Sequence, residues 1–365
     1  MDILSEPTSA LSRIKSIDIA KGIGILLVVL SHTNHTEPLS TLVYSVHMPL
    51  FFIISGMMFN PEKYKTVKSL LKKRFITMIC PYVLINFFAV LLFVGTKVLN
   101  GTVSGAPLIF KTLGYNFSQI FIASTSHTME FNVPTWFVMT LLLVEVIYYF
   151  ICKCKNNIVK FIIVLAIVVA GFFTSFETFP VDLTKYLPWN FSAALFSLGF
   201  YYLGNISFNY IKKYLSRDKE IENRTLILIL SVPIATALWL PSAMLNGKIT
   251  IGSQSYGTGI LLYASGVFGT VIILAIASLI GKCSFLEYCG KNSLYIMATH
   301  KVVQNYTQPY IEAAYKSVFK QEAGVWMKTL IMLVFCTAVS LLFTLLYTRF
   351  IKPLFRKIQG NVSKA

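Results

Sequence analysis

The chain has 365 residues, of which 55% are apolar and only 13% are charged, and its mean hydropathy is +0.67. Soluble domains carry about a quarter charged residues, so this composition excludes an ordinary soluble domain, and it equally excludes a disordered chain. The formal net charge of +17 raises the question of a nucleic-acid partner, which the positions of the basic residues must answer.

Apolar runs of about 17 to 25 residues predict helices that cross a membrane. Ten such runs follow one another along the chain, at 17–36, 39–59, 75–97, 134–151, 158–175, 188–206, 225–241, 259–280, 293–311 and 327–348. The predicted fold class is therefore an all-α polytopic integral membrane protein, a single bundle of about ten helices. The two weakest spans by this pattern are 225–241, which carries Pro233, and 293–311, which contains Lys301 and Gln304.

The segments between these runs predict one domain, 17–348, flanked by two cytoplasmic tails, 1–16 and the basic 349–365. Most connections are short. The exception is 98–133, which we predict to be a long outside loop; loops of that length are commonly functional or mobile. We expect no cleavable signal peptide, because the first apolar run follows a polar tail and is long enough to span.

The basic residues predict the orientation of the bundle. With a cytoplasmic N-terminus, 23 of the 32 Lys and Arg residues fall in cytoplasmic segments, seven in outside segments and two within spans. This bias follows the positive-inside rule, so we expect both termini in the cytoplasm. The excess charge is then an orientation signal that also suits an anionic leaflet. Membrane lipid is the expected partner, and nucleic acid is not.

Ionisable side chains inside the predicted spans are candidate functional residues, because such groups are costly in hydrocarbon. They are Lys21, His32, His47, Glu145, His300 and Lys301. Lys21 and His32 are eleven residues apart, which brings them within about 20° of one direction and about 16 Å apart in height. They therefore share one helix face, with Lys21 near the cytoplasmic boundary and His32 near the outer end. Two structural alternatives stay open: Lys21 snorkels to the interface, and Glu145 anchors the bundle through a hydrogen bond.

Motifs for other chemistries are missing from the sequence. It has no glycine-rich phosphate loop, no HExxH, no GxSxG and no Cys-rich metal set. We therefore expect no metal, and we interpret the six cysteines as reduced packing residues. The chemistry left is acid or base catalysis by histidine and anion binding by lysine and arginine.

Four segments resemble the membrane O-acyltransferases of acyltransferase family 3, most closely their fucose 4-O-acetylase-like branch. They are SIDIAKGIGILLVVLSHT (16–33), YSVHMPLFFIISGMMF (44–59), PTWFVMTLLLVEVI (134–147) and CGKNSLYIMATHK (289–301). The first is similar to the family's Arg/Lys-x10-His pattern, through Lys21 and His32. The second is similar to its HMPLFF…SG pattern around His47, and the fourth to its late SLYI-x-x-x-H element, which ends at His300.

The resemblance implies ten core helices and transfer of an acyl group from cytoplasmic acyl-CoA to a hydroxyl of a cell-envelope glycan. It also implies that His32 is catalytic and that Lys21 acts with it. Many relatives carry an Arg-x-x-Arg pair before the third helix. This chain has Arg74 and Thr77 there instead, although Lys72 and Lys73 keep the local positive charge.

These expectations assign a role to each candidate residue. The phosphates of the acetyl-CoA donor are expected on Lys68, Lys72, Lys73 and Arg74, since cations suit phosphates. His32 is the expected general base, with an acyl-imidazole intermediate left open. His47 is expected to stabilise the oxyanion or orient the acceptor, and His300 to position the donor. The expected acceptor-binding residues are Trp136, Glu130 and Glu145, with Trp136 stacking on a sugar.

The competing function is a proton-coupled transporter of a small molecule, since buried His, Lys and Glu suit that role as well. The sequence shows no inverted repeat and no matched pair of Gly- or Pro-interrupted helices, which favours the enzyme. The expected acceptor is an envelope glycan or a lipid-linked sugar, and the expected location is a bacterial cytoplasmic membrane. The sequence does not predict the oligomeric state.

Overall fold

The computed structural model describes residues 14–33, 35–123, 129–174, 187–216, 223–351 and 353. These residues are almost entirely helical, and the only β-type pairing among them is an isolated bridge between Thr250 and Ser255. Most of the two predicted tails, 1–16 and 349–365, lies outside the described residues.

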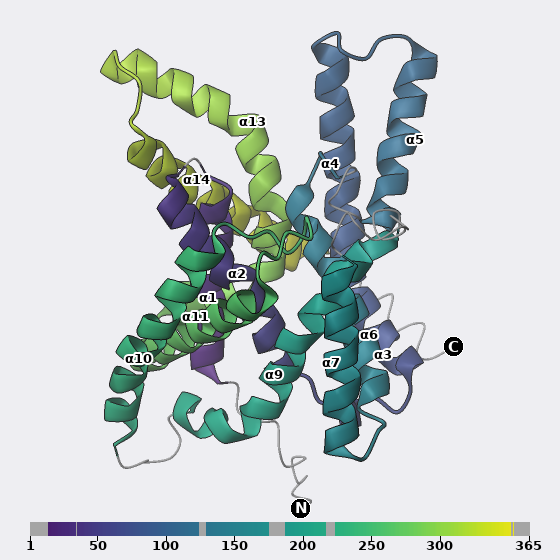
Figure 1. Cartoon of the computed structure of the whole chain (residues 1–365). Helices are drawn as coiled ribbons and strands as arrows, with labels where there is room; N and C mark the ends of the chain where they lie inside the picture. Colours follow the sequence, from purple (N-terminus) through teal and green to yellow (C-terminus); the bar gives the residue numbers. More distant parts are fainter. Residues whose placement is uncertain are drawn as a thin grey trace, which may run out of the picture.

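The helices of the bundle follow the chain as shown in Figure 1. They are α1 (Lys15–Ser31), α2 (Glu37–Met57), α3 (Val67–Arg74), α4 (Cys80–Leu99), α5 (Ala106–Ile122), α6 (Trp136–Ile151), α7 (Asn157–Phe173), α9 (Phe191–Leu215), α10 (Arg224–Asn246), α11 (Gly259–Ile280), α12 (Ser284–Lys291), α13 (Ser293–Phe319) and α14 (Val325–Leu346). Short 3-10 or π turns extend several of them: η1 (Pro61–Lys63), η2 (Phe75–Ile79), η3 (Val133–Thr135), η4 (Pro188–Asn190) and η5 (Tyr347–Ile351).

Each of the ten predicted runs coincides with one of these helices. Six helical stretches of the described chain are long and apolar enough to cross a membrane: Glu37–Met57, Val67–Leu99, Val133–Ile151, Arg224–Asn246, Gly259–Ile280 and Val325–Ile351. The protein is therefore an all-helical, multi-pass membrane protein. Helices α1 and α7 have 17 residues each, while α9 and α13 are longer but more polar. The count of ten spans and the orientation stay predictions.

The segment 98–133, predicted as a long loop, contains the 17-residue helix α5. Helices α4 and α5 form an antiparallel hairpin that projects at one end of the molecule (Figure 1). The Tyr82 hydroxyl at the base of α4 donates to the Ile120 carbonyl of α5 at 2.6 Å. The physical reason is that apolar residues recur through 106–122 at helical spacing, although the segment is too short and too polar to stand out as a membrane span.

Glycines let the central helices approach closely. A side chain at Gly56 would overlap the Tyr201 carbonyl, so α2 packs backbone to backbone against α9. A side chain at Gly290 would similarly overlap the Asp18 carbonyl, where α12 lies against α1. Small residues at such crossings are typical of helix packing within membranes. These contacts hold α2 against α9 and α1 against α12, and α1 and α2 also pack against each other.

Large apolar side chains cover the outside of the bundle. Ile158 on α7 is 70% exposed, Ile234 on α10 is 63% exposed and Ile260 on α11 is 81% exposed. An exposed apolar surface this extensive is unfavourable in water, and it suits helices that face lipid.

Candidate active site

Three histidines from three helices meet near the ends of α1 and α13. His32 caps the C-terminus of α1, and its ring centroid lies 5.3 Å from that of His300 on α13, with the ring planes at 42°. His47, in the middle of α2, lines one pocket together with His32. The sequence therefore predicted three residues that the fold brings together.

The histidine pocket, as we call the cavity lined by His32 and His47, has a volume of about 110 Å³. Its walls come from α1, α2, the start of α6, the loop 249–253 and Met297 of α13. Pockets for whole small molecules measure about 300–1,000 Å³. The histidine pocket is therefore too small for a whole small molecule, and its volume suits a single small group of one.

The hydrogen bonds of two histidines fix which ring nitrogen carries the proton. Nδ1 of His47 donates to the Val43 carbonyl at 2.7 Å, and Nδ1 of His300 donates to the Ile296 carbonyl at 3.0 Å. Because a carbonyl only accepts, Nδ1 carries hydrogen in both rings, and Nε2 of each neutral ring is an acceptor. Nε2 of His300 is buried and has no hydrogen-bond partner among the described residues. The His32 ring is the neighbouring aromatic group beside it.

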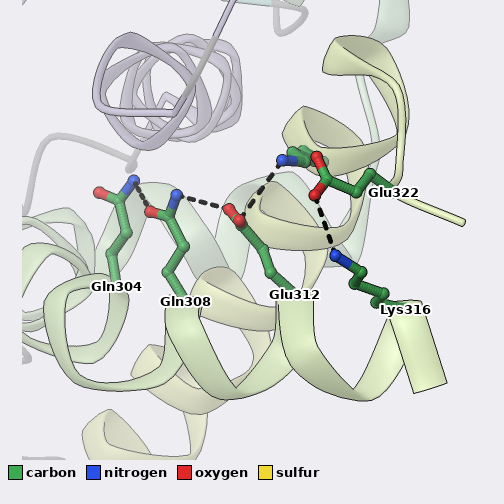
Figure 2. Close-up of polar contacts among 6 residues, drawn as sticks. Gln304, Gln308, Glu312, Lys316 and Glu322 are labelled. Carbon is green, nitrogen blue, oxygen red and sulfur yellow. Dashed lines mark hydrogen bonds and ion pairs between the residues drawn. The ribbon is translucent and has the colours of Figure 1, made fainter.

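Gln304 holds the backbone at His32. Its Nε2 donates to the His32 carbonyl at 2.6 Å, and its Oε1 accepts from the Lys301 ammonium at 3.1 Å. Figure 2 shows a polar row along α13 that starts at Gln304, in which Gln304 donates to Gln308 at 3.2 Å and Gln308 donates to Glu312 at 2.8 Å. Gln304 is buried. Its amide, which binds the His32 carbonyl, is therefore the inner end of this row.

A second buried polar cluster supports His300 from the other side. The Asn132 amide donates to the Ala298 carbonyl at 2.8 Å and to Oδ1 of Asn86 at 3.0 Å. The Thr135 hydroxyl donates to the same Asn86 oxygen at 3.2 Å. These bonds tie α4 and the start of α6 to the turn of α13 that carries His300.

Trp136 and Tyr44 narrow the histidine pocket. The Trp136 ring packs against Gly252, where any side chain would overlap the indole. The Tyr44 ring lies 5.0 Å from the His47 ring in an edge-on contact, and its hydroxyl donates to the Ser31 carbonyl at 3.3 Å. Both rings are therefore held in place before any ligand binds.

Arg74 and Glu145 form a bidentate ion pair. Nε of Arg74 donates to Oε2 of Glu145 at 2.5 Å, and Nη2 donates to Oε1 at 2.7 Å. The Glu145 side chain is only 3% exposed. The sequence predicts Arg74 at the donor and Glu145 at the acceptor; in the structure the two side chains bind each other. It also shows Glu145 in the anchoring contact that the sequence left open, since the pair ties α3 to α6.

The remaining predicted residues lie away from the histidine pocket. Lys68, Lys72 and Lys73 project from α3 and are exposed. Lys21 is half-buried in α1 and does not line the histidine pocket. Glu130 is 72% exposed, with its carboxylate 3.9 Å from the Lys97 ammonium. It too lies outside the histidine pocket.

Sequence reasoning missed Gln304 and the loop 249–253. Gln304 carried a usable signal, because it follows His300 by four residues and so lies on the same helix face. The loop carried no signal: Ile249, Thr250 and Ser253 are ordinary residues, and only the fold places them over the pocket. Within the described residues, no group of three or more His, Cys, Asp or Glu side chains is arranged to hold a metal ion.

Comparison with protein families gives a match over most of the chain. The family model Acyl_transf_3, described as an acyltransferase domain, matches residues 14–348. That range contains the three histidines, Gln304 and the Arg74–Glu145 pair. No match was found among the curated proteins.

Proposed function

The chain belongs to the acyltransferase 3 family, and from this premise we propose that it is a membrane O-acetyltransferase of the fucose 4-O-acetylase-like branch. It would move an acetyl group from cytoplasmic acetyl-CoA to a hydroxyl of an envelope or exported glycan. The observation that carries the proposal is the contact between the His32 and His300 rings beside a pocket shared with His47.

The donor would enter from the cytoplasmic side. The exposed ammonium groups of Lys68, Lys72 and Lys73 supply positive potential for its phosphates, and Lys21 would lie at the mouth. From Lys21 to His32 the rise along α1 is about 16 Å, a distance that the extended pantetheine arm of coenzyme A can bridge. The thioester would then reach the histidine pocket.

The transfer step follows from the chemistry of a neutral imidazole. His32 takes the proton of the acceptor hydroxyl while the hydroxyl oxygen attacks the thioester carbonyl carbon. The new C–O bond forms, the C–S bond breaks, and the imidazolium returns the proton to the departing thiolate. The alternative is attack by His32 itself, followed by transfer from the acyl-imidazole to the acceptor.

The other two histidines would orient this step. Because Nδ1–H of His47 is bound to Val43, its Nε2 is an acceptor, which favours orienting the substrate hydroxyl over donating to an oxyanion. The unpaired Nε2 of His300 beside His32 suits a role in holding the His32 ring. We therefore assign His300 the role of supporting the catalytic base His32. The sequence instead suggested that His300 positions the acyl donor.

The acceptor would be an envelope glycan or a lipid-linked sugar in a bacterial cytoplasmic membrane. The small volume of the histidine pocket admits the edge of one sugar, with Trp136 on its wall as a stacking surface. Glu130, on the outer surface, would meet only distant parts of a long glycan.

Purified protein in proteoliposomes tests the proposal against a proton-coupled transporter. Labelled acetyl-CoA is supplied with and without a glycan acceptor. Thioester consumption that the acceptor stimulates supports the enzyme, and flux across the bilayer that needs no acceptor supports the transporter. Loss of an acetyl mass increment from the envelope glycans of cells that lack the protein would identify the product.

A further inference from the structure

A second cavity lies away from the histidine pocket, at the predicted cytoplasmic side. It has a volume of about 1070 Å³ and lies between the segment 61–65, the end of α6, the start of α7 and the last turns of α9. We call it the basic cleft, because its charged lining residues are Lys65, Lys153, Lys160 and a single acid, Glu62. It therefore carries a net positive charge.

An apolar groove of about 470 Å³ continues from the basic cleft between α7, α9 and the start of α11. Tyr202 lines both cavities, and the consecutive residues Lys160 and Phe161 of α7 line one each. From Phe161 to Phe172 the groove follows α7 for about 16 Å. That length is about half of a hydrocarbon core roughly 30 Å thick, which is the depth of one leaflet.

We propose that the basic cleft and the apolar groove together bind one anionic phospholipid of the cytoplasmic leaflet. Its phosphate would meet Lys65, Lys153 and Lys160, and an acyl chain would fill the groove. Charge and depth both support this occupant: the cations lie at the predicted inner membrane surface, where anionic headgroups are concentrated, and the groove runs inward from them. The tyrosines at the junction suit the interface between headgroup and hydrocarbon.

The basic cleft also adjoins a junction of three helices. Tyr148, on its wall, donates to Oδ1 of Asn205 at 2.8 Å. The Asn205 amide donates to the carbonyls of Gly56 at 2.9 Å and Phe59 at 2.8 Å, at the end of α2. Helix α2 carries His47 at its centre. A lipid in the basic cleft would thus brace α6 and α9 against the helix that forms part of the histidine pocket.

Native mass spectrometry of the purified full chain tests the proposal. The protein is titrated with phosphatidylglycerol or with phosphatidylcholine that has the same acyl chains. We expect phosphatidylglycerol to be retained at lower concentration. One lysine near an anionic lipid surface is worth about fivefold in affinity, so the triple variant K65Q/K153Q/K160Q should weaken phosphatidylglycerol binding on the order of one hundredfold.

Two matched controls separate this site from general charge and general lipid contact. The variant K212Q/K213Q/K282Q removes the same charge from exposed lysines of the predicted cytoplasmic side that lie outside the basic cleft, and it should bind phosphatidylglycerol as the wild type does. Leu165→Trp fills the groove and should lower the retention of both lipids several-fold. Ile162→Trp, on an exposed face of α7 outside the groove, should lower neither.

Three results would overturn the proposal: equal retention of the two lipids, equal effects of the two triple lysine variants, or unchanged binding in Leu165→Trp. Adenosine 3′,5′-bisphosphate is added as a competing probe, and displacement of phosphatidylglycerol by it would assign the basic cleft to a nucleotide instead. The readout uses neither a thioester nor an acceptor. A negative result here would therefore leave the proposed acetyl transfer untouched, and the reverse is also true.

Discussion

The histidine pocket and the lysines of α3 differ in how firmly their side chains are held. Around the histidine pocket, the rings of His47 and His300 are anchored through Nδ1 to carbonyls of their own helices, and the His32 carbonyl accepts from a buried amide. On α3, Lys68 and Lys72 are exposed, and Lys73 lies over the Tyr64 ring at 5.5 Å. The first region is preorganised, while the second supplies a diffuse positive potential.

This difference separates two kinds of contribution to catalysis. A preorganised group stabilises a transition state because it needs no rearrangement when charge develops. A mobile lysine on a surface adds affinity and encounter rate, both of which salt screens. We therefore expect substitutions in the histidine pocket to act on turnover, and substitutions on α3 to act on the use of the donor.

The largest expected effect is that of His32→Ala. Losing a general base typically costs 10²- to 10⁴-fold in rate, and we expect a loss in this range. The measurement is kcat for labelled acetyl transfer by protein of unchanged thermal stability. His35→Ala is the matched control: His35 is bonded to the Thr33 carbonyl at 2.6 Å and lies outside the pocket. A well-folded and fully active His32→Ala enzyme would refute the assignment.

The Arg74–Glu145 pair tests whether α3 is anchored or free. Removing one partner of a buried ion pair leaves an unpaired charge, so Glu145→Gln should lower the free energy of unfolding by about 3 kcal/mol. The double variant Arg74→Met/Glu145→Leu should recover part of that loss, because neither charge remains. Thermal unfolding in detergent measures both. If Arg74→Met and Glu145→Leu, made singly, prove additive in the double variant, the pair is not the anchor that the geometry indicates.

Gln304→Leu probes the support behind His32. It leaves the partly buried His32 carbonyl without the Gln304 donor, a loss of about 1–3 kcal/mol, and we expect kcat to fall about tenfold while KM for acetyl-CoA is unchanged. Gln308→Leu, one turn further along the row in Figure 2, does not touch His32 and should leave kcat unchanged. A rise in KM without a fall in kcat would place Gln304 at the donor instead.

The sequence predicted much of this fold because hydrophobic run length is a direct consequence of membrane thickness. Each of the ten predicted runs overlaps a helix of the described residues, whereas α5 was missed because its 17 residues include polar ones such as Gln119 and Lys111. Buried histidines were equally visible, since ionisable residues in apolar runs are conspicuous.

Contacts between residues of different helices could not be predicted from the sequence in the same way. Arg74 and Glu145 are 71 residues apart, and nothing in the pattern of either run specifies the other. The contact of Gln304 with the His32 carbonyl spans 272 residues, and it depends on the register between α1 and α13. Such pairings are set by helix packing, which a single sequence specifies only through the sum of many weak contacts.

The smallest effect is expected from substitution of the exposed lysines of α3. Lys68→Gln/Lys72→Gln leaves the Arg74–Glu145 pair intact and should raise KM for acetyl-CoA a few-fold at low salt, since exposed charges contribute modestly. The rise should shrink at high ionic strength, while kcat and the acceptor KM stay constant. Lys111→Gln/Lys320→Gln removes equal charge from exposed sites at the opposite, predicted outer side and should change nothing. An equal rise in both KM values would mean that α3 does not act on the donor, and a rise that salt leaves unchanged would mean that these lysines are held as firmly as the histidines.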